Sequence, residues 1–231
     1  MIGLGTIINV SAIIIGGILG LLFQNKLTNK IQESLTLAIG TATLFLGISG
    51  ALEIMLDRSG LTTMLILSLA IGTLLGELID IEAKFEQFGK WLKIKTNNTH
   101  DSKFLDAFIT TSLTVCIGAM AIVGSIQDGM QGDYSLLMAK AILDFIIVMI
   151  FASSLGKGCL FSFIPVGVFQ GSITLLASFI QPIMTETALS NLSLIGSILI
   201  FLVGVNLVWD KKIRISNMLP SIIIAIIFAF I

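Results

Sequence analysis

Charged residues are scarce in this sequence. Only 12% of its 231 residues are Asp, Glu, Lys or Arg, whereas 55% are hydrophobic and the mean hydropathy is +1.04. A soluble domain carries about 25% charged residues, so the composition excludes an ordinary soluble protein and predicts an integral membrane protein. The lipid bilayer is therefore the first expected partner.

Cysteine and histidine are almost absent. Cys116 and Cys159 lie in or beside apolar segments without CxxC spacing, and His100 is the only histidine. This pattern excludes a disulfide framework and a Cys/His metal site, so we expect no metal and no cofactor. GxSxG and HExxH motifs are also missing, and we expect no enzymatic activity. No basic segment precedes the first apolar run, so we do not expect a cleavable signal peptide.

Long apolar runs are what the sequence has instead. A helix needs about 20 mostly apolar residues to cross a bilayer. We therefore predict an all-α, polytopic membrane helix bundle that forms a single transmembrane domain over residues 1–231. About eight spans are expected, at residues 4–23, 35–52, 61–78, 104–126, 136–155, 160–180, 192–209 and 218–231.

Lysine and arginine gather on alternate connections between these spans. Four connections that share one side of the membrane hold 11 cations, whereas the opposite side holds only Arg58. Because positive charge is retained in the cytoplasm, both termini are predicted to lie outside. The 11 cations are Lys26, Lys30, Lys84, Lys90, Lys93, Lys95, Lys103, Lys157, Lys211, Lys212 and Arg214.

The longest connection contains an amphipathic segment, residues 83–95. Phe85, Phe88 and Trp91 recur in it at helical spacing with lysines between them. This pattern predicts a helix that lies on the inner membrane surface. The alternative is a basic patch that binds nucleic acid or a protein partner, and we favour the membrane surface, with no nucleic acid.

An internal repeat is a further hypothesis. Residues 8–46 align without a gap on residues 164–202, with nine identities. The match reflects either a duplication or the abundance of Ile and Leu. A duplication would relate spans 1–3 to spans 6–8 in opposite orientation, an inverted repeat of the kind that secondary transporters use.

Small residues form stripes along several predicted spans. Gly16 and Gly20 follow Ala12 at four-residue spacing, and Gly72 and Gly76 follow Ser68 in the same way. Such stripes allow helices to approach closely in a bilayer. They predict packing within the chain and also allow a homodimer.

An ionisable pair falls inside the fifth predicted span. Asp144 lies eight residues into it, near the midplane, and Lys140 lies one turn earlier on the same face. Ionisable groups at this depth are costly and mark functional sites by default. The pair either lines a solute or ion pathway or simply neutralises itself while Lys140 extends outward.

Other polar residues lie within the apolar spans. Gln170 lies midway along its span, where Gln-Gly-Ser is expected to loosen the helix and free carbonyl groups to line a cavity. Thr43 and Asn9 are candidates for the same pathway or for interhelical hydrogen bonds. Glu77 ends its span near the inner face, as Lys157 does, which predicts either a salt bridge or an ion site.

The link between the fourth and fifth spans is acidic. Gln127, Asp128 and Asp133 lie in a seven-residue stretch with Gly129. Asp-Gly favours a turn, so the stretch is either a surface turn or the outer entrance of a pathway that leads to Asp144.

Three stretches carry a family resemblance. CIGAMAIVGSIQDGMQGD, KAILD at residues 140–144, and IGTLLGELIDIE resemble the YdfK/YqgA-type family of bacterial inner-membrane proteins, a family of unknown function. The likeness extends over the chain from NVSAIIIGGILG onward and implies a multi-pass protein of the bacterial cytoplasmic membrane. It places Gln127, Asp128, Asp133, Lys140 and Asp144 in family signature stretches, without assigning them a role.

Two functions follow from these observations. The first is a transporter or channel for a small cation or a polar, zwitterionic solute, with a midplane site around Asp144 and Gln170. The alternative is a membrane scaffold or regulatory protein that docks partners through residues 83–95.

Overall fold

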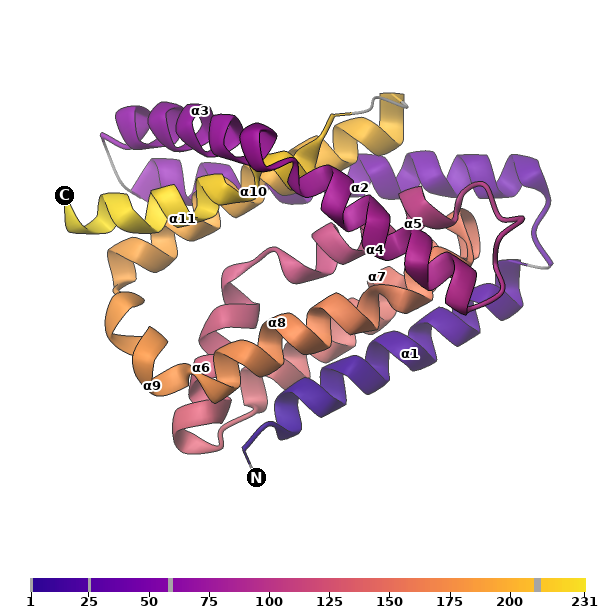
Figure 1. The fold of residues 1–231 in the computed structure, drawn as a ribbon, viewed down its shortest axis with the longest axis horizontal. Helices are drawn as coiled ribbons and strands as arrows, with labels where there is room; N and C mark the ends of the chain where they lie inside the picture. The colour runs from indigo at the N-terminus through magenta and orange to yellow at the C-terminus, as the bar shows by residue number, and fades with distance from the viewer. Residues whose placement is uncertain (1, 25, 58–59, 210–212) are drawn as a thin grey trace. The chain divides into compact units, whose positions relative to one another are not determined.

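The computed structural model describes residues 2–24, 26–57, 60–209 and 213–231, and no strand occurs in these ranges. Eleven α-helices and four short 3-10 segments account for the regular structure that is described (Figure 1). The α-helices are α1 (Leu4–Gln24), α2 (Asn29–Asp57), α3 (Thr62–Ile79), α4 (Ile81–Lys95), α5 (Phe104–Cys116), α6 (Ala119–Gln131), α7 (Ser135–Leu155), α8 (Phe163–Leu175), α9 (Ala177–Ile180), α10 (Glu186–Trp209) and α11 (Pro220–Ile227).

Six helical segments of the described chain are long and apolar enough to cross a membrane. They are α1, α2, α3, α7, the segment Lys157–Leu175, and α10. A seventh span is formed if α5 and residues Met120–Gln131 of α6, which are bent by 61°, count as one broken span. The eighth predicted span falls on a shorter apolar helical segment, Ile215–Phe230, so the described residues contain six or seven membrane-crossing segments rather than the predicted eight. The protein is thus an all-α polytopic helix bundle.

Three of the cations behind the predicted orientation, Arg58, Lys211 and Lys212, lie outside the described residues. The placement of both termini outside the cell stays a prediction.

By packing, the chain forms two compact units, although a single transmembrane domain is expected from the sequence. The first unit comprises Met1–Ile39, Glu86–Cys116 and Met120–Gln181, and the second comprises Gly40–Phe85, Ile117–Ala119 and Pro182–Ile231.

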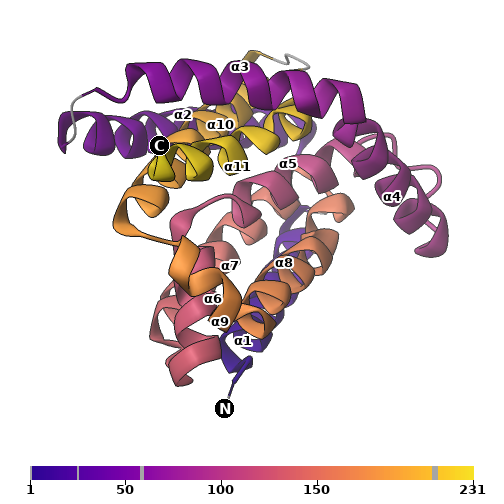
Figure 2. The same ribbon diagram turned by 60° about the vertical axis from the view of Figure 1, so that its left-hand side comes forward.

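In the first unit, α1 lies against α7 along most of its length, and α8 also packs on α1. Figures 1 and 2 both show these three helices side by side. The glycine stripe of α1 makes this approach feasible, because a Cβ atom at Gly16 would lie 2.5 Å from the carbonyl oxygen of Phe145. A Cβ atom at Gly20 would likewise collide with the carbonyl oxygen of Met149. The prediction that this stripe packs within the chain is confirmed.

An apolar cluster joins four helices of the first unit. Ile13 of α1, Val115 of α5, Val148 of α7 and Val166 of α8 are all buried and pack together. Because each residue comes from a different helix, the cluster fixes the level at which the four helices meet.

In the second unit, α3 packs on α11, and α10 packs on α11 (Figure 2). Gly72 of α3 lies against Ser221, and Gly76 lies against the backbone of Asn217. The second small-residue stripe therefore also serves packing within the chain, as predicted.

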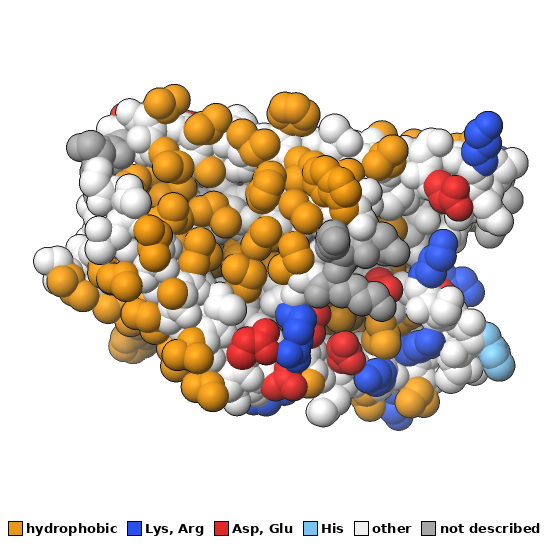
Figure 3. Space-filling model, turned by 90° about the horizontal axis from the view of Figure 1, so that it is seen from above, with side chains coloured by type: hydrophobic (Ala, Val, Ile, Leu, Met, Phe, Trp, Pro, Cys, Tyr) orange, Lys and Arg blue, Asp and Glu red, His pale blue; other side chains and the backbone are white. Residues whose placement is uncertain are grey.

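The surface of the protein is strongly apolar. On the face in Figure 3, hydrophobic side chains form a broad field, and the charged side chains gather toward one side of it. α3 illustrates the pattern, because Ile66, Leu74 and Leu78 are 58%, 61% and 75% exposed. Exposed apolar surface of this extent suits contact with lipid rather than water.

The amphipathic segment predicted at residues 83–95 is helical, and α4 extends it to Ile81–Lys95. The rings of Phe88 and Trp91 stack with centroids 5.8 Å apart, and both side chains are exposed. The position of α4 on the membrane surface stays a prediction.

Candidate functional site

The Lys140–Asp144 pair lies in the first half of α7 and is buried. The ammonium nitrogen of Lys140 is 2.8 Å from Oδ1 of Asp144 and 2.6 Å from Oδ2. Lys140 is only 7% exposed and Asp144 only 3%. The expected pairing is present, but the expectation that Lys140 extends outward is wrong for this structure, since its charged end stays among protein atoms.

Two further hydrogen bonds complete the pair. The Lys140 ammonium also donates to the carbonyl oxygen of Val115 at 2.8 Å. The amide nitrogen of Asn9 donates to Oδ2 of Asp144 at 2.9 Å. A buried ion pair is stable only when additional hydrogen bonds satisfy its charges, and here α5 and α1 supply them. Asn9 therefore makes one of the interhelical hydrogen bonds that the sequence predicts.

A helix break supplies the carbonyl group that Lys140 uses. α5 ends at Cys116, and Gly118 has a φ of +151° before the chain resumes as α6. The carbonyls in the last turn of a helix have no partner within it, so Val115 can accept the ammonium group. The sequence predicts a loosened helix at Gln170 instead, and this prediction is wrong because α8 is continuous over Phe163–Leu175.

Gln170 is 1% exposed, and both polar atoms of its amide lack a hydrogen-bond partner. It lies on α8 one turn after Val166, whereas Asn9 precedes Ile13 by one turn in α1. α8 runs antiparallel to α1. Gly17, later in α1, lies against Leu160, whereas Val10, earlier in α1, lies against Gly167, which comes later in the chain than Leu160.

The same reasoning places Gln170 level with Asp144. α1 and α7 run parallel, since Gly16 lies against Phe145 and Gly20 against Met149. Asp144 precedes Val148 by one turn, so it lies on the same side of the apolar cluster as Asn9. One turn is about 5.4 Å, so Gln170, Asn9 and Asp144 each lie one turn from the cluster, on the same side of it and at a similar level along their helices.

More buried polar groups lie beyond this level, toward the start of α1. Thr6 precedes Asn9 by about one turn, and Thr174 follows Gln170 by one turn. Both residues are buried, and neither hydroxyl has a hydrogen-bond partner. We call Asp144, Asn9, Gln170, Thr6 and Thr174 the polar column.

Asp128 lies at the end of this column and is fully buried. Its carboxylate accepts hydrogen bonds from the backbone N–H of Gly3 at 3.2 Å and of Gly5 at 3.1 Å. These donors belong to the start of α1, where N–H groups have no partner within the helix and favour negative charge. Asp128 is thus the N-terminal cap of α1, supplied by another helix.

The prediction of a turn at Asp128-Gly129 is wrong. α6 continues to Gln131, and the chain turns only afterwards, at Gly132 with a φ of +68°. Gly129 has no side chain because a Cβ atom there would collide with the carbonyl oxygen of Thr174. Gln127 is half-buried in α6.

Asp133 is exposed and serves the start of α7. Its carboxylate accepts hydrogen bonds from the Ser135 hydroxyl at 2.6 Å and from the Ser135 backbone N–H at 3.0 Å. The Ser135 hydroxyl, followed by this N–H, holds the pKa of Asp133 below its usual range. Asp133 thus has a local capping role, and Asp128 and Asp133 are not equivalent acidic groups at an entrance.

Thr43 and Glu77 belong to the second unit. Thr43 is buried in α2 at 4% exposure. Glu77 forms an exposed salt bridge with Arg214 at 2.7 Å, and Arg214 also pairs with Asp80. The salt-bridge reading of Glu77 therefore describes this structure better than the ion-site reading, with Arg214 as the partner.

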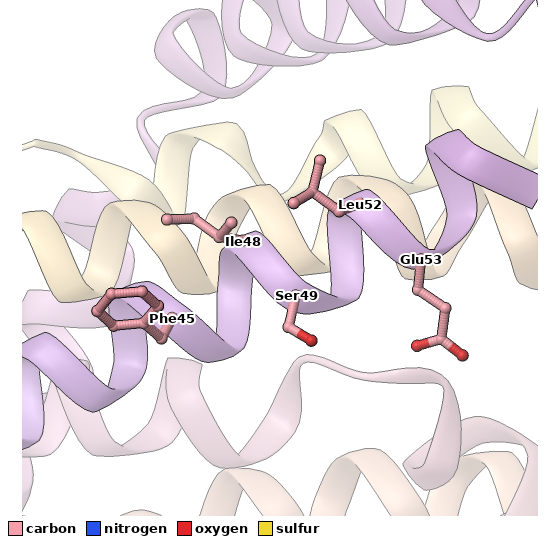
Figure 4. Close-up of a pocket in the computed structure, with 5 residues that line it drawn as sticks. All are labelled: Phe45, Ile48, Ser49, Leu52 and Glu53. Atoms are coloured by element: carbon pink, nitrogen blue, oxygen red, sulfur yellow. The ribbon is translucent and has the colours of Figure 1, made fainter.

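Two surface depressions of the second unit lie along α2. Phe45, Ile48, Ser49, Leu52 and Glu53 line the first (Figure 4). All five lie along one helix, so the depression is a shallow face rather than an enclosed site. Glu53 also borders the second depression. Within the described residues, no group of three or more His, Cys, Asp and Glu side chains could hold a metal ion.

Sequence reasoning missed Thr6, Thr174 and the Val115 carbonyl. The two threonines were detectable, because each recurs at helical spacing from a polar residue already selected, Asn9 or Gln170. The role of the carbonyl depends on where α5 breaks, and apolar residues on both sides of Gly118 hide that position.

Comparison with known proteins places the chain among membrane proteins without an assigned activity. Residues 4–230 match the family model described as "Protein of unknown function (DUF554)". The chain is 31% identical over 227 residues to the "Uncharacterized membrane protein YdfK" of Bacillus subtilis (strain 168), covering 98% of this chain and 96% of that protein. It is 30% identical over 229 residues to the "Uncharacterized protein YqgA" of Escherichia coli (strain K12), covering 96% and 94%. No solved structure gives a significant match.

Proposed function

Since the chain belongs to the DUF554 family of unknown function, we propose its function from its own geometry: a membrane transporter or channel for a small cation or a polar, zwitterionic solute. The polar column is the proposed pathway, and Asp144 with Gln170 is the proposed midplane site. The bacterial cytoplasmic membrane, with both termini outside, is the proposed location. In that orientation the Asp128 end of the column faces the exterior.

The buried amide of Gln170 is the observation that carries the proposal. An amide buried without partners costs about 1–3 kcal/mol, and both polar atoms of Gln170 lack one. Packing alone would be served better by Leu or Met at this position. The unpaired groups of Thr6 and Thr174 add to the cost, and a bound or passing polar solute would satisfy all three.

The charges at the site suit a solute that carries positive charge or both charges. Asp144 and Lys140 together are neutral and lie within 2.6–2.8 Å of each other. A zwitterion could pair its ammonium group with Asp144 and its carboxylate with Lys140, while the Gln170 amide both donates and accepts hydrogen bonds. A small cation would need Asp144 alone.

The inverted repeat fits the proposal as a mechanism. The alignment of residues 8–46 with 164–202 pairs α1 with α8 and α2 with α10, and its continuation pairs α3 with α11. Each of these pairs belongs largely to one unit. Gly167 lies against Val10, Gly204 against Leu44, and Gly72 against Ser221. Pairs of this kind support two related halves that exchange between outward and inward states.

Uptake by proteoliposomes tests the proposal. Purified protein is reconstituted and offered a panel of small inorganic cations, amino acids and other zwitterions, with Gln170→Met and Asp144→Asn as variants. Asp133→Asn is the matched control, because its carboxylate is exposed and lies outside the column. We expect the wild type and the control to transport at least one solute and both column variants to lose it. If wild type and Asp144→Asn were equally inactive toward every solute, the proposal would be abandoned.

α4 supports a second candidate, a scaffold or regulatory protein. Trp91 is 53% exposed and stacks on Phe88, which suits either an interfacial anchor or a docking surface. A stable partner that co-purifies with the wild type and is lost on Trp91→Ala would favour this candidate over transport.

A further inference from the structure

We propose that the ammonium group of Lys140 is a tethered substitute for an inorganic monovalent cation, and that exchange between the two drives or gates transport. The inference rests on the proposed function and names the ion of that same site. The cation is of the size of ammonium, K⁺ or NH₄⁺, and its ligands are Asp144 and the carbonyl oxygen of Val115.

The ammonium group lies among oxygen atoms placed as they would be around a cation. It contacts both carboxylate oxygens of Asp144, at 2.8 and 2.6 Å, and the Val115 carbonyl oxygen at 2.8 Å. Carbonyl oxygens freed where a membrane helix breaks are the groups that coordinate ions in discontinuous-helix transporters. α5 ends at Cys116, immediately after Val115, so this carbonyl is such a group.

Charge balance sets the valence of the ion. The cluster contains one carboxylate, and Asn9 adds a neutral amide. One positive charge neutralises Asp144, whereas a divalent ion would leave an excess charge in a buried place, which is expensive. Lys140 and a monovalent cation are therefore alternatives at Asp144.

A free acceptor is available for an incoming ion. Oδ1 of Asn9 is buried without a hydrogen-bond partner, while the other end of the same amide donates to Asp144. Because the nitrogen of the Asn9 amide contacts the Asp144 carboxylate, the oxygen of the same amide lies near it. This oxygen provides a further ligand for a hard monovalent cation once Lys140 has left.

Lys140 also has a direction in which to withdraw. It lies one turn nearer the start of α7 than Asp144, and its long flexible stem allows the ammonium group to move by several ångströms. Thr6 and Thr174 of the polar column lie toward that side and could accept hydrogen bonds from it. The exchange then begins with a rotamer change of Lys140 toward these hydroxyls.

Chemical rescue of Lys140→Met tests the inference. This variant leaves Asp144 without a partner, so its melting temperature in detergent should fall in choline chloride, whose cation is too large for the site. In KCl or NH₄Cl we expect a saturable rise of several degrees, and methylammonium should act similarly because it replaces the missing end of the lysine. The double variant Lys140→Met/Asp144→Asn is the control and should show no preference among these salts. A rise in NaCl alone would assign a smaller ion and contradict the proposed size, and identical melting in all salts would overturn the inference.

A second measurement uses the wild type and does not depend on whether the variant folds. Lys140 is modified with a membrane-permeant amine reagent in KCl or in choline chloride, and the modification at residue 140 is read by mass spectrometry. If K⁺ displaces the ammonium group, modification should rise several-fold with K⁺ concentration, while exposed Lys157 serves as the unaffected control. Equal modification in both salts would show that Lys140 stays paired and would contradict the exchange.

The two hypotheses fail in different ways. Solute uptake that proceeds at the same rate in K⁺ and in choline, with no rise in Lys140 modification, would reject the tethered cation and leave transport intact. Rescue by K⁺ in a protein that transports nothing would retain the cation site and reject the proposed function.

Discussion

Asn9 in α1 donates a hydrogen bond of 2.9 Å to Asp144 in α7, across 135 residues of sequence. The bond joins the two helices that pack most extensively in the first unit. It lies one turn from the apolar cluster that contains Ile13 and Val148. A charged site is therefore built directly on the most extensive helix contact of this unit.

The ion pair predicts a non-additive effect on stability. Asp144→Asn leaves the Lys140 ammonium buried without its counter-charge, and we expect a loss of about 3–5 kcal/mol. Lys140→Met/Asp144→Asn removes both charges and should cost clearly less than the sum of the single variants. Unfolding in mixed detergent micelles provides the measurement. Additive losses would show that the pair is not coupled in the folded protein.

The glycine stripe of α1 predicts a contrast between two glycines. Gly20→Ala places a Cβ atom against the Met149 carbonyl oxygen of α7, and overpacking of this kind costs about 1–3 kcal/mol. Gly171→Ala is the matched control, because no atom lies within 4 Å of its added Cβ and alanine favours a helix. The melting temperature should fall for Gly20→Ala and stay level or rise for Gly171→Ala. The reverse order would refute the described contact between α1 and α7.

Asp128 and Asp133 predict another contrast. Asp128→Ala removes the cap of α1, and we expect a loss of about 1 kcal/mol, within the range for N-terminal caps. Asp133→Ala removes an exposed contact with Ser135 and should change stability little at neutral pH. Melting temperatures of both variants, measured in the same detergent, check the difference.

The contact between Asp133 and Ser135 depends on pH in a direction that the lowered pKa of Asp133 sets. The folded-state pKa of Asp133 is lowered, first by the Ser135 hydroxyl, so its small contribution is complete above the unfolded-state pKa. It disappears as the pH falls through the folded-state value. If the stability of Asp133→Ala differed from that of wild type only below the folded-state pKa, and not above the unfolded-state pKa, the assigned contact with Ser135 would be contradicted.

Gln170 predicts a separation of stability from activity. Gln170→Met fills a similar volume without an unpaired buried amide, so the variant should be as stable as wild type or more stable, by about 1–3 kcal/mol. Its solute uptake should nevertheless be lost. Thermal melting and proteoliposome uptake on the same preparation check both expectations. A destabilised variant with full uptake would assign Gln170 to packing.

The sequence predicts much of the fold because the physical signals are local. The lack of charge, the apolar runs and the four-residue spacing of Gly16 and Gly20 depend only on neighbouring residues. They correctly predict a polytopic helix bundle and the close packing of α1, although the described residues contain six or seven membrane-crossing segments rather than about eight. The Lys140–Asp144 pair was also detectable, since one helical turn separates the two residues.

The remaining features depend on contacts that sequence spacing does not encode. Asp128 caps a helix 123 residues away, so its Asp-Gly pattern wrongly suggests a turn. Arg214 reaches Glu77 across 137 residues. The break at Gly118 lies within an apolar run, whereas the more polar Gln170-Gly171-Ser172 stretch remains helical, with the Ser172 hydroxyl bonded back to the Phe169 carbonyl oxygen of the same helix.

Access of water-borne reagents to residue 170 tests the central claim, that the polar column is a hydrated pathway. The triple variant Gln170→Cys/Cys116→Ala/Cys159→Ala carries a single cysteine, at residue 170. Proteoliposomes that contain this variant are treated with a charged, membrane-impermeant methanethiosulfonate reagent. Wild-type Cys159, which is fully buried, is the reference for an inaccessible thiol and is retained in a Cys116→Ala control. The account predicts rapid modification at residue 170 and none at Cys159 in the folded protein. If the cysteine at residue 170 is as inert as Cys159 until the protein is denatured, the column is a dry packing interface and the proposed pathway is wrong.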